Sequence, residues 1–313
     1  MIARSSTAAI LLVIGAAGCR PTGLQPGEGY IAVPGGNVWY RIVGSGNATP
    51  LLVLHGGPGA PSYYLKPFAA LADERPVVFY DQLGAGHSDP ITDTTLLTVE
   101  RFVAELAAVR EALGLDEVHI LGHSWGTMLA TDYLLTKPRG VRSVIFASPA
   151  ISIPRWLADA DTLLMTMPDS IQAAVARHEA DGTFADPEYQ AAVMAFYRRY
   201  VGRKLPWSAD VDSTFTQLSM MVYGHMWGPS EFTATGTLQD YDRTDRLHEI
   251  TIPTLFTTGR YDEARPQTVE YYQSLIPGAA LAIFENSAHL TMQDEPAENV
   301  WIVREFLRTV ERR

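Results

Sequence analysis

The sequence of 313 residues predicts an α/β fold in which helices cover both faces of a mostly parallel sheet. Six apolar runs of strand length support this prediction, and a helical stretch or a loop follows each of them: residues 51–54, 77–80, 118–121, 144–147, 254–258 and 281–284. Strands without a polar face are typical of parallel sheets that are buried on both sides. The alternation stops between about Ile151 and Leu247, where the pattern favours amphipathic helices. A helical cap inserted between two sheet strands is therefore predicted there.

The composition is that of a folded globular protein, with 47% hydrophobic and 19% charged residues. The 24 basic and 35 acidic side chains give a formal net charge of −11, and Lys and Arg form no run that could neutralise a phosphate backbone. The sequence therefore predicts no nucleic-acid partner. At roughly 150 residues per domain, the length corresponds to about two domains or to one large α/β unit with an insertion.

The N-terminal segment resembles a secretory signal. Arg4 precedes an apolar run at residues 8–14, and small residues then lead to Cys19, the only cysteine of the chain. The run is too short to span a bilayer, which takes about 20 apolar residues. Small residues before a lone cysteine resemble the lipobox of bacterial lipoproteins, although Ala16 stands where a Leu is usual. Residues 1–19 are thus expected to direct export to the bacterial cell envelope, with a protein that is periplasmic or tethered to the membrane through a lipidated Cys19. An ordinary cleaved signal and a retained anchor remain the alternatives.

The remaining elements follow in chain order. A Gly- and Pro-rich linker is predicted at residues 20–29, and a hairpin follows with strands at 30–33 and 38–43, whose turn contains two glycines that can adopt positive φ. An apolar stripe predicts a helix over 99–113 that ends at Gly114. The cap, residues 151–247, has helical patterns at 170–180 and 187–201. The α/β core then comprises residues 30–150 and 248–313.

The first chemical signal is Gly-His-Ser-Trp-Gly at residues 122–126, which lies directly after one predicted strand and before an apolar helix that begins near Thr127. In a Gly-x-Ser-x-Gly elbow, the glycines permit a turn so tight that the serine hydroxyl is exposed above the sheet. The motif therefore identifies Ser124 as the candidate nucleophile.

The second signal is His-Gly-Gly-Pro-Gly at residues 55–59, at the end of the first apolar strand. Acyl transfer needs backbone N–H groups aimed at the developing oxyanion, and a glycine-rich turn brings the backbone close to a substrate. Gly57 and Trp125 are the predicted donors, with Gly56 as the alternative to Gly57. A phosphate loop is disfavoured because no Lys-Ser or Lys-Thr follows.

A serine nucleophile needs a base and an orienting carboxylate, which follow it in the order acid and then histidine. His289 is the only histidine beyond the fifth predicted strand, and it comes just after the last one. Asp262, in the loop after residues 254–258, is the expected acid, with Glu263 as the alternative. Asp262 would hold the His289 tautomer and stabilise the imidazolium. This chemistry requires no metal and no organic cofactor.

With these motifs collected, residues 30–313 resemble the proline iminopeptidase family of α/β-hydrolases. The glycine loop, the stretch at residues 80–88, the elbow with Trp125, and the acid and histidine segments all match this family. Leu83 departs from it, since many members carry Arg there. The branch of tricorn-interacting aminopeptidases, also apolar at this position, is the closer likeness through residues 224–232 and the Asp262-Glu263 pair.

The resemblance implies a serine aminopeptidase that releases an N-terminal residue, preferably proline, from peptides or aminoacyl amides. It also implies that Glu231 and Glu263 hold the substrate α-ammonium. Alternatively, Glu231 is a solvated cap residue or a helix cap, and Glu263 pairs with Arg260 or Arg265. Several apolar cap residues could either wall a pocket for the pyrrolidine ring or form the core of the cap: Phe215, Met220, Met221, Tyr223, Met226, Trp227 and Phe232.

Two rival functions fit the same sequence. An amino-acid amidase, an esterase or a lactonase could use the same triad under a different cap. A catalytically silent binding protein at the cell envelope is the rival of another class, and the complete set of Ser124, Asp262, His289 and the glycine loop argues against it.

Overall fold

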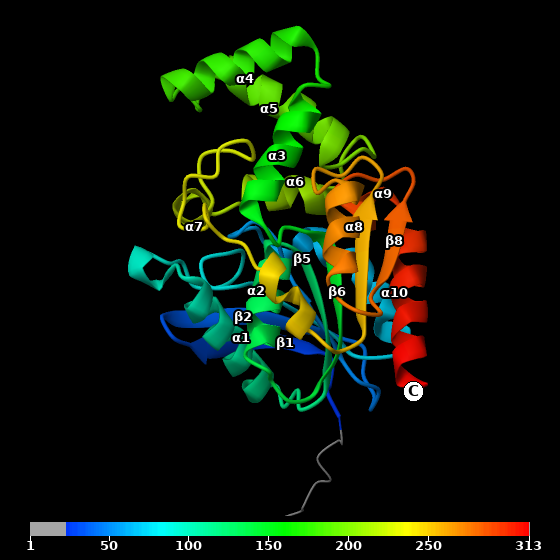
Figure 1. Ribbon diagram of the computed structural model, residues 1–313. Coiled ribbons are helices and arrows are strands. Elements are labelled where there is room, and N and C mark those ends of the chain that lie inside the picture. Colours follow the sequence, from blue (N-terminus) through cyan, green and yellow to red (C-terminus); the bar gives the residue numbers. More distant parts are fainter. Residues whose placement is uncertain (1–22, 313) are drawn as a thin grey trace, which may run out of the picture.

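The computed structural model describes residues 23–312, which form an eight-stranded sheet in the order β1-β2-β4-β3-β5-β6-β7-β8 (Figure 1). The pairs β1–β2 and β2–β4 are antiparallel, and all other neighbouring strands are parallel. The strands are β1 (Gly27–Val33), β2 (Gly36–Val43), β3 (Leu51–Leu54), β4 (Val77–Tyr80), β5 (Val118–Ser124), β6 (Val141–Pro149), β7 (Thr254–Gly259) and β8 (Ala280–Phe284). The predicted α/β fold class is confirmed.

All six predicted apolar strands are present, and β3 and β4 have the predicted bounds. The hairpin differs at its start, because β1 begins at Gly27 and not at residue 30. Backbone pairing with β2 continues through Gly29↔Tyr40 to Gly27↔Ile42, and such hydrogen bonds do not depend on side-chain pattern. The end of the predicted linker is therefore part of the sheet.

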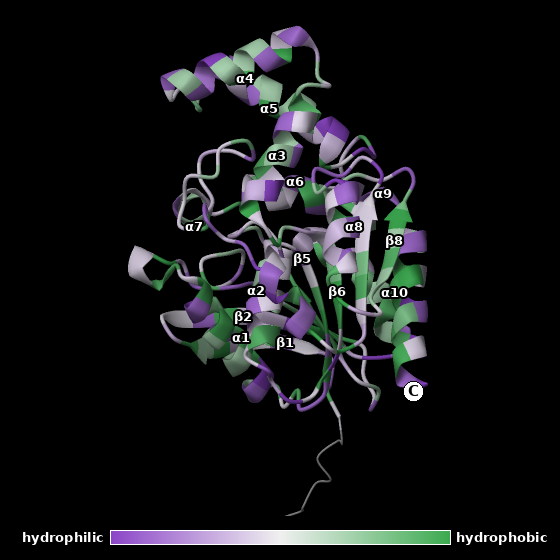
Figure 2. Cartoon of the chain, viewed as in Figure 1, coloured by the Kyte–Doolittle hydropathy of each residue, from purple (hydrophilic) through white to green (hydrophobic). Residues whose placement is uncertain are grey.

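Helices cover both faces of the sheet. The 3₁₀ helix η1 (Ser62–Asp73) and α10 (Pro296–Glu311) pack on one face, and α1 (Val99–Ala112), α2 (Trp125–Leu135) and α8 (Pro266–Ser274) pack on the other. Successive residues of β3 alternate between the two buried clusters, which explains why this strand has no polar side. Apolar colours accordingly dominate β6 and β8 in Figure 2, whereas they alternate with polar colours around α10.

Five α-helices lie between β6 and β7, in the interval predicted to form the cap: α3 (Ile153–Leu164), α4 (Asp169–Asp181), α5 (Pro187–Tyr200), α6 (Ala209–Thr216) and α7 (Met220–Met226). In Figure 1, α4 and α5 lie farthest from the sheet, beyond the carboxyl ends of the parallel strands. The two helices predicted at residues 170–180 and 187–201 correspond to α4 and α5 within one residue at each end.

The helix predicted over residues 99–113 is observed as α1. The side chain of Thr98 accepts a hydrogen bond from the Arg101 N–H at its start, and Gly114 follows its end with φ 63°. The short remaining helices are η2 (Thr94–Leu96), η3 (Thr244–Glu249) and α9 (Thr291–Asp294).

The predicted signal at residues 1–19, including Cys19, lies outside the described residues. Within residues 23–312, none of the helices has the length and apolar character needed to cross a bilayer.

Candidate active site

Ser124 stands at the junction of β5 and α2, where the chain turns sharply. Its φ of 54° is unusual for a residue with a side chain, and such strain typically costs about 1–3 kcal/mol. Both flanking glycines are required by close backbone approach. A Cβ on Gly122 would lie 2.3 Å from the Gly126 carbonyl oxygen, and one on Gly126 would lie 2.4 Å from the Leu54 oxygen. The turn predicted from the motif is thus built as expected.

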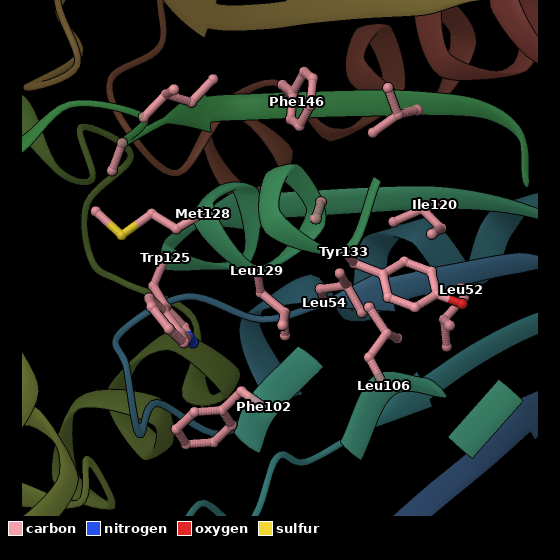
Figure 3. Packing of buried hydrophobic residues seen from close by; sticks show 14 of the residues in the cluster. Leu52, Leu54, Phe102, Leu106, Ile120, Trp125, Met128, Leu129, Tyr133 and Phe146 are labelled. Atoms are coloured by element: carbon pink, nitrogen blue, oxygen red, sulfur yellow. The ribbon is translucent and has the colours of Figure 1, made fainter. Parts of the chain in front are cut away.

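Trp125 fixes the backbone that follows the nucleophile. Its side chain is fully buried, and its ring meets that of Phe102 edge-on at a centroid distance of 5.6 Å, within the apolar cluster shown in Figure 3. The Trp125 Nε1–H also donates to Gln82 Oε1 at 2.8 Å. These contacts hold the Trp125 backbone N–H, the predicted oxyanion donor, at the first position of α2.

The glycine loop is held by hydrogen bonds on both sides. The Gln82 N–H donates to His55 Nε2 at 2.8 Å, so Nδ1 carries the His55 proton and donates to the Gly56 carbonyl at 2.9 Å. Burial lowers the pKa of His55, which agrees with this neutral form. The Gly56 N–H donates to the Tyr64 hydroxyl at 2.7 Å and is therefore occupied. The Gly57 N–H, by contrast, has no acceptor within residues 23–312.

His289 and Asp262 meet through a buried hydrogen bond. The distance between His289 Nδ1 and Asp262 Oδ1 is 2.8 Å, and the Ala264 N–H donates to the same carboxylate oxygen at 2.8 Å. Burial by itself raises the pKa of Asp262. The charge and hydrogen bond of His289, together with the hydrogen bond from the Ala264 N–H, outweigh burial and hold that pKa below its usual value. Asp262 is therefore an anion fixed against the imidazole.

Glu263, the alternative acid, lies near the opposite nitrogen of the same ring. Its Oε1 is 3.7 Å from His289 Nε2, and its Oε2 has no hydrogen-bond partner within residues 23–312 although the side chain is buried. The arginines considered as its partners are engaged elsewhere: Arg260 pairs with Glu285, and Arg265 with Asp159. Glu263 is thus a buried carboxylate that faces the site without a cation.

Glu231 approaches from the loop after α7. It is half-buried, and its Oε1 accepts a hydrogen bond from the Tyr223 hydroxyl at 2.5 Å. Burial raises the pKa of Glu231, while the Tyr223 bond and His289 only partly oppose this effect. Burial and the nearby charges of Glu231 and Asp262 raise the pKa of Glu263 well above its usual value. Within residues 23–312, neither carboxylate therefore pairs with a Lys or Arg side chain that would stabilise its charge.

One cavity of about 80 Å³ joins these groups. A single water molecule occupies about 10–15 Å³ of this kind of volume, so the cavity has room for a small ring. Ser124, His289, Glu231 and Glu263 all line it, together with Gly56 and Gly57. The predicted site residues from the elbow, the glycine loop, the cap and the last two strands are thus brought together. The cavity mouth and walls are completed by apolar and aromatic side chains: Tyr64, Tyr197, Val201, Val211, Phe215, Leu218, Tyr223 and Leu290.

Of the seven apolar cap residues that the sequence suggested for pocket walls, only Phe215 and Tyr223 line the cavity. Met220 and Met221 are exposed, and the others are packed in or against the hydrophobic clusters of the cap and core. The hydroxyl of Tyr64 was not predicted as part of the site, because Tyr64 does not belong to any of the recognised motifs. Gln82 could have been found, because it lies within the motif at residues 80–88.

A pH-dependent effect on stability follows from the raised pKa of Glu263. The contribution of Glu263 to the free energy of unfolding is fully present below its pKa in the unfolded chain, near 4.5. That contribution is lost as pH rises through its higher pKa in the folded protein. Glu263→Gln is therefore expected to raise the thermal midpoint by about 2–4 °C at pH 8 and to leave it unchanged near pH 4. Scanning fluorimetry from pH 4 to pH 8 measures the difference. Glu111→Gln, at an exposed position on α1, is the control, and a lower midpoint for Glu263→Gln at pH 8 would contradict the argument.

Among the residues that the structure describes, one group has ligand atoms close enough to hold a metal ion: His178, Asp186 and Glu188, in the segment from α4 to α5. Arg177 already pairs with Glu188, and its guanidinium also lies 3.2 Å from His178 Nε2. A cation thus occupies this position within the chain itself, and none of these residues lines the cavity of Ser124.

Comparison with known proteins identifies similar chains. Residues 49–296 match the family model of the α/β-hydrolase fold. The proline iminopeptidase of Heyndrickxia coagulans is 48% identical over 287 residues, which cover 90% of this chain and 99% of that protein. Among solved structures, the proline iminopeptidase of Mycobacterium smegmatis matches with a TM-score of 0.84 at 35% identity, covering 91% of this chain and 98% of that one. The structure of VinJ matches with a TM-score of 0.88 at 34% identity, covering 91% and 100%.

Proposed function

This chain belongs to the proline iminopeptidase family of α/β-hydrolases, and from that premise we propose how it acts on its substrate. It is a serine aminopeptidase that releases an N-terminal residue, preferably proline, from short peptides. Ser124 is the proposed nucleophile, His289 the general base and acid, and Asp262 the residue that orients His289.

The observation that carries the proposal is the pair Glu231 and Glu263 in the same cavity as Ser124. Carboxylates in a partly desolvated site attract a cation strongly, and the α-ammonium of a peptide is such a cation. An anchor at a fixed distance from the nucleophile selects the first peptide bond, since only that carbonyl then reaches Ser124. An ester or amide substrate without a free amine gives these two acids no role.

The loop that carries Glu231 is itself held in place by a third acid. The Ser230 and Thr233 hydroxyls both donate to Glu179 Oε1 of α4, at 3.3 and 2.7 Å. Glu231 lies between these two residues, so its carboxylate is presented by a short anchored loop. This arrangement supports a binding role over that of a freely solvated cap residue.

The proposed reaction is a double displacement. The Ser124 Oγ attacks the carbonyl carbon of the first residue while His289 takes the hydroxyl proton, and the N–H groups of Gly57 and Trp125 stabilise the oxyanion. The C–N bond then breaks as His289 returns the proton to the leaving amine. Water, activated by His289, hydrolyses the aminoacyl ester, releases the free amino acid and restores Ser124.

Initial rates on a panel of chromogenic amides test the proposal. The panel contains Pro, Ala, Leu and Phe amides, each beside its N-acetylated form, and a simple acyl ester. The expected result is the highest rate on the free-amine Pro substrate and loss of activity on acetylation. If acetylation does not change the rates, or if only the ester is hydrolysed, the enzyme is an amidase or an esterase and not an aminopeptidase.

Glu231→Gln separates the anchor from the catalytic groups. The amide keeps the shape of the side chain but loses its charge, so kcat/KM for Pro amides is expected to fall about 10- to 100-fold, whereas ester hydrolysis is expected to stay within about twofold. Steady-state kinetics on both substrates make the comparison, with Glu111→Gln as the control. An equal loss on the ester would show that Glu231 does not act through the substrate amine.

We further propose that residues 1–19 direct export and that Cys19 is lipidated, which would tether the enzyme to the cell envelope. The support is the sequence itself: a basic residue, an apolar run and small residues before the only cysteine. Mass spectrometry of the membrane-associated protein should find an acylated Cys19 as the first residue, and Cys19→Ser should release the protein from the membrane. A mature chain that keeps residue 1, or that begins with unmodified Cys19, would contradict this proposal.

A further inference from the structure

Tyr64 and His123 link the three segments that carry the proposed catalytic groups. The Gly56 N–H donates to the Tyr64 hydroxyl at 2.7 Å, and that hydroxyl lies 2.9 Å from His123 Nδ1. His123 Nε2 lies 3.0 Å from the carbonyl oxygen of His289. Because His123 is also the neighbour of Ser124, this hydrogen-bonded chain joins the glycine loop, the elbow and the histidine loop.

The direction of every bond in this chain is fixed by chemistry. A carbonyl oxygen can only accept a hydrogen bond. His123 Nε2 therefore carries a proton and donates a hydrogen bond to the carbonyl oxygen of His289. Burial and the nearby His289 lower the pKa of His123 to about 3, so the ring is neutral and Nδ1 keeps its lone pair. The Tyr64 O–H must then donate to Nδ1, while its oxygen accepts from the Gly56 N–H.

Two consequences follow for the oxyanion hole. Tyr64 lines the cavity beside Ser124, but its proton is committed to His123 and is not available to a substrate oxygen. The Gly56 N–H is committed in the same way, so of the two N–H groups considered for the oxyanion hole, only that of Gly57 has no acceptor within residues 23–312. Tyr64 thus fixes the peptide that precedes the donor without being a donor itself.

The hydrogen-bonded chain of Gly56, Tyr64, His123 and His289 is buried, and its polar atoms have few other hydrogen-bond partners. Tyr64 is 3% exposed and His123 is 1% exposed, so water cannot replace a lost partner. The His289 carbonyl also accepts from Ser148 Oγ at 2.9 Å, which gives the backbone of that histidine two buried donors. The ring of His123 packs edge-on against the ring of His289 at a centroid distance of 4.6 Å.

We propose that Tyr64 and His123 are positioning residues. They hold the oxyanion donor Gly57, the nucleophile Ser124 and the base His289 at fixed positions relative to one another. The proposal rests on the reaction at Ser124 proposed above, but not on the identity of its substrate. If the hydrogen-bonded chain is broken, Gly56 is free to turn and the Gly57 N–H no longer points at the developing oxyanion. The loss then falls on the transition state and spares substrate binding.

Tyr64→Phe tests this directly, because it removes one oxygen and keeps the ring. The expected result is a fall in kcat of about 10- to 100-fold with KM within about twofold, measured on whichever substrate of the panel the unaltered enzyme hydrolyses best. Tyr63→Phe is the matched control: its hydroxyl, on the same 3₁₀ helix, contacts Gln217 and His87 outside the site. Rates are normalised to the sites labelled by a fluorophosphonate, and thermal midpoints identify any unfolded variant.

A boronic acid analogue of the best substrate distinguishes positioning from a general structural loss. It forms a tetrahedral adduct with the serine, so its inhibition constant should rise in Tyr64→Phe by about the same factor as kcat falls. Inhibition by the free amino acid product, which forms no such adduct, should be unchanged. Equal weakening of both inhibitors, or an unchanged kcat, would overturn the proposal, whereas an unaltered enzyme that hydrolyses no member of the panel would refute the proposed function first.

A double-mutant cycle provides the second test. His123→Phe keeps a ring but removes both nitrogens, and it should lower kcat by a similar factor. If the two residues act through one chain, the double variant Tyr64→Phe/His123→Phe loses little more than the worse single variant. Multiplied losses would show that Tyr64 and His123 act independently. The control combination of His123→Phe with Tyr63→Phe should show the loss of His123→Phe alone.

Discussion

Ser124→Ala is expected to lower kcat by about 10⁶-fold and to leave the fold intact, because the change removes the nucleophilic oxygen and nothing that holds the elbow. Alanine carries the same Cβ at φ 54°, so the backbone strain at this position is unchanged. The residual rate would come from the oxyanion donors and from substrate binding. Burst kinetics and fluorophosphonate labelling measure the effect, and both should disappear together.

The matched control for this change is Ser274→Ala, at an exposed position at the end of α8. It should leave kcat, KM and labelling unaltered, while circular dichroism and thermal midpoint should be the same for both variants and the parent. Turnover retained by Ser124→Ala, or a label mapped by peptide mass spectrometry to another serine, would remove Ser124 from the mechanism.

Asp262→Asn is expected to lower kcat by about 10⁴-fold, the second largest effect. The amide keeps the size of the side chain, but it removes the anion that stabilises the protonated His289 and that selects its tautomer. The measurement is kcat on the acyl ester and the Pro amide. Both should fall, since the His289 proton transfer is common to the two reactions.

Glu263→Gln is the control for this second prediction, because Glu263 is the adjacent acid of the same loop and lies near the other ring nitrogen of His289. If Asp262 is the orienting acid, Glu263→Gln keeps its activity on the neutral ester and loses activity only on free-amine substrates. The reversed pattern, with ester hydrolysis lost in Glu263→Gln and kept in Asp262→Asn, would assign the orienting role to Glu263.

The strands and the elbow could be predicted because their signals are local. Apolar runs such as residues 51–54 are buried on both faces, so their composition alone distinguishes them from the amphipathic helices between them. The turn at Ser124 requires glycines at fixed spacing, which a sequence displays directly. The start of β1 at Gly27 could not be read in this way, because backbone pairing, not side-chain pattern, extends that strand.

The cap illustrates the opposite case. Its helices were predictable from their periodicity, but which of their apolar residues face the cavity was not, and Phe215 and Tyr223 line it whereas Met220 and Met221 are exposed. A helix of two turns such as α7 presents apolar side chains all round. The face that is covered depends on how the helix packs against the core, and no local pattern records that.

The sequence by itself determined the fold class and the order of the proposed catalytic groups, because each of these depends on residue type at short spacing. Its resemblance to the proline iminopeptidase family implied the two acids of the proposed amine anchor. Only the tertiary structure decided between alternatives that depend on distance. It paired Arg260 and Arg265 with acids other than Glu263, and it occupied the N–H of Gly56 but not that of Gly57. Such contacts join residues as far apart in the sequence as Arg265 and Asp159, 106 positions, and they form only when packing of the sheet, the cap and the loops has fixed all their positions.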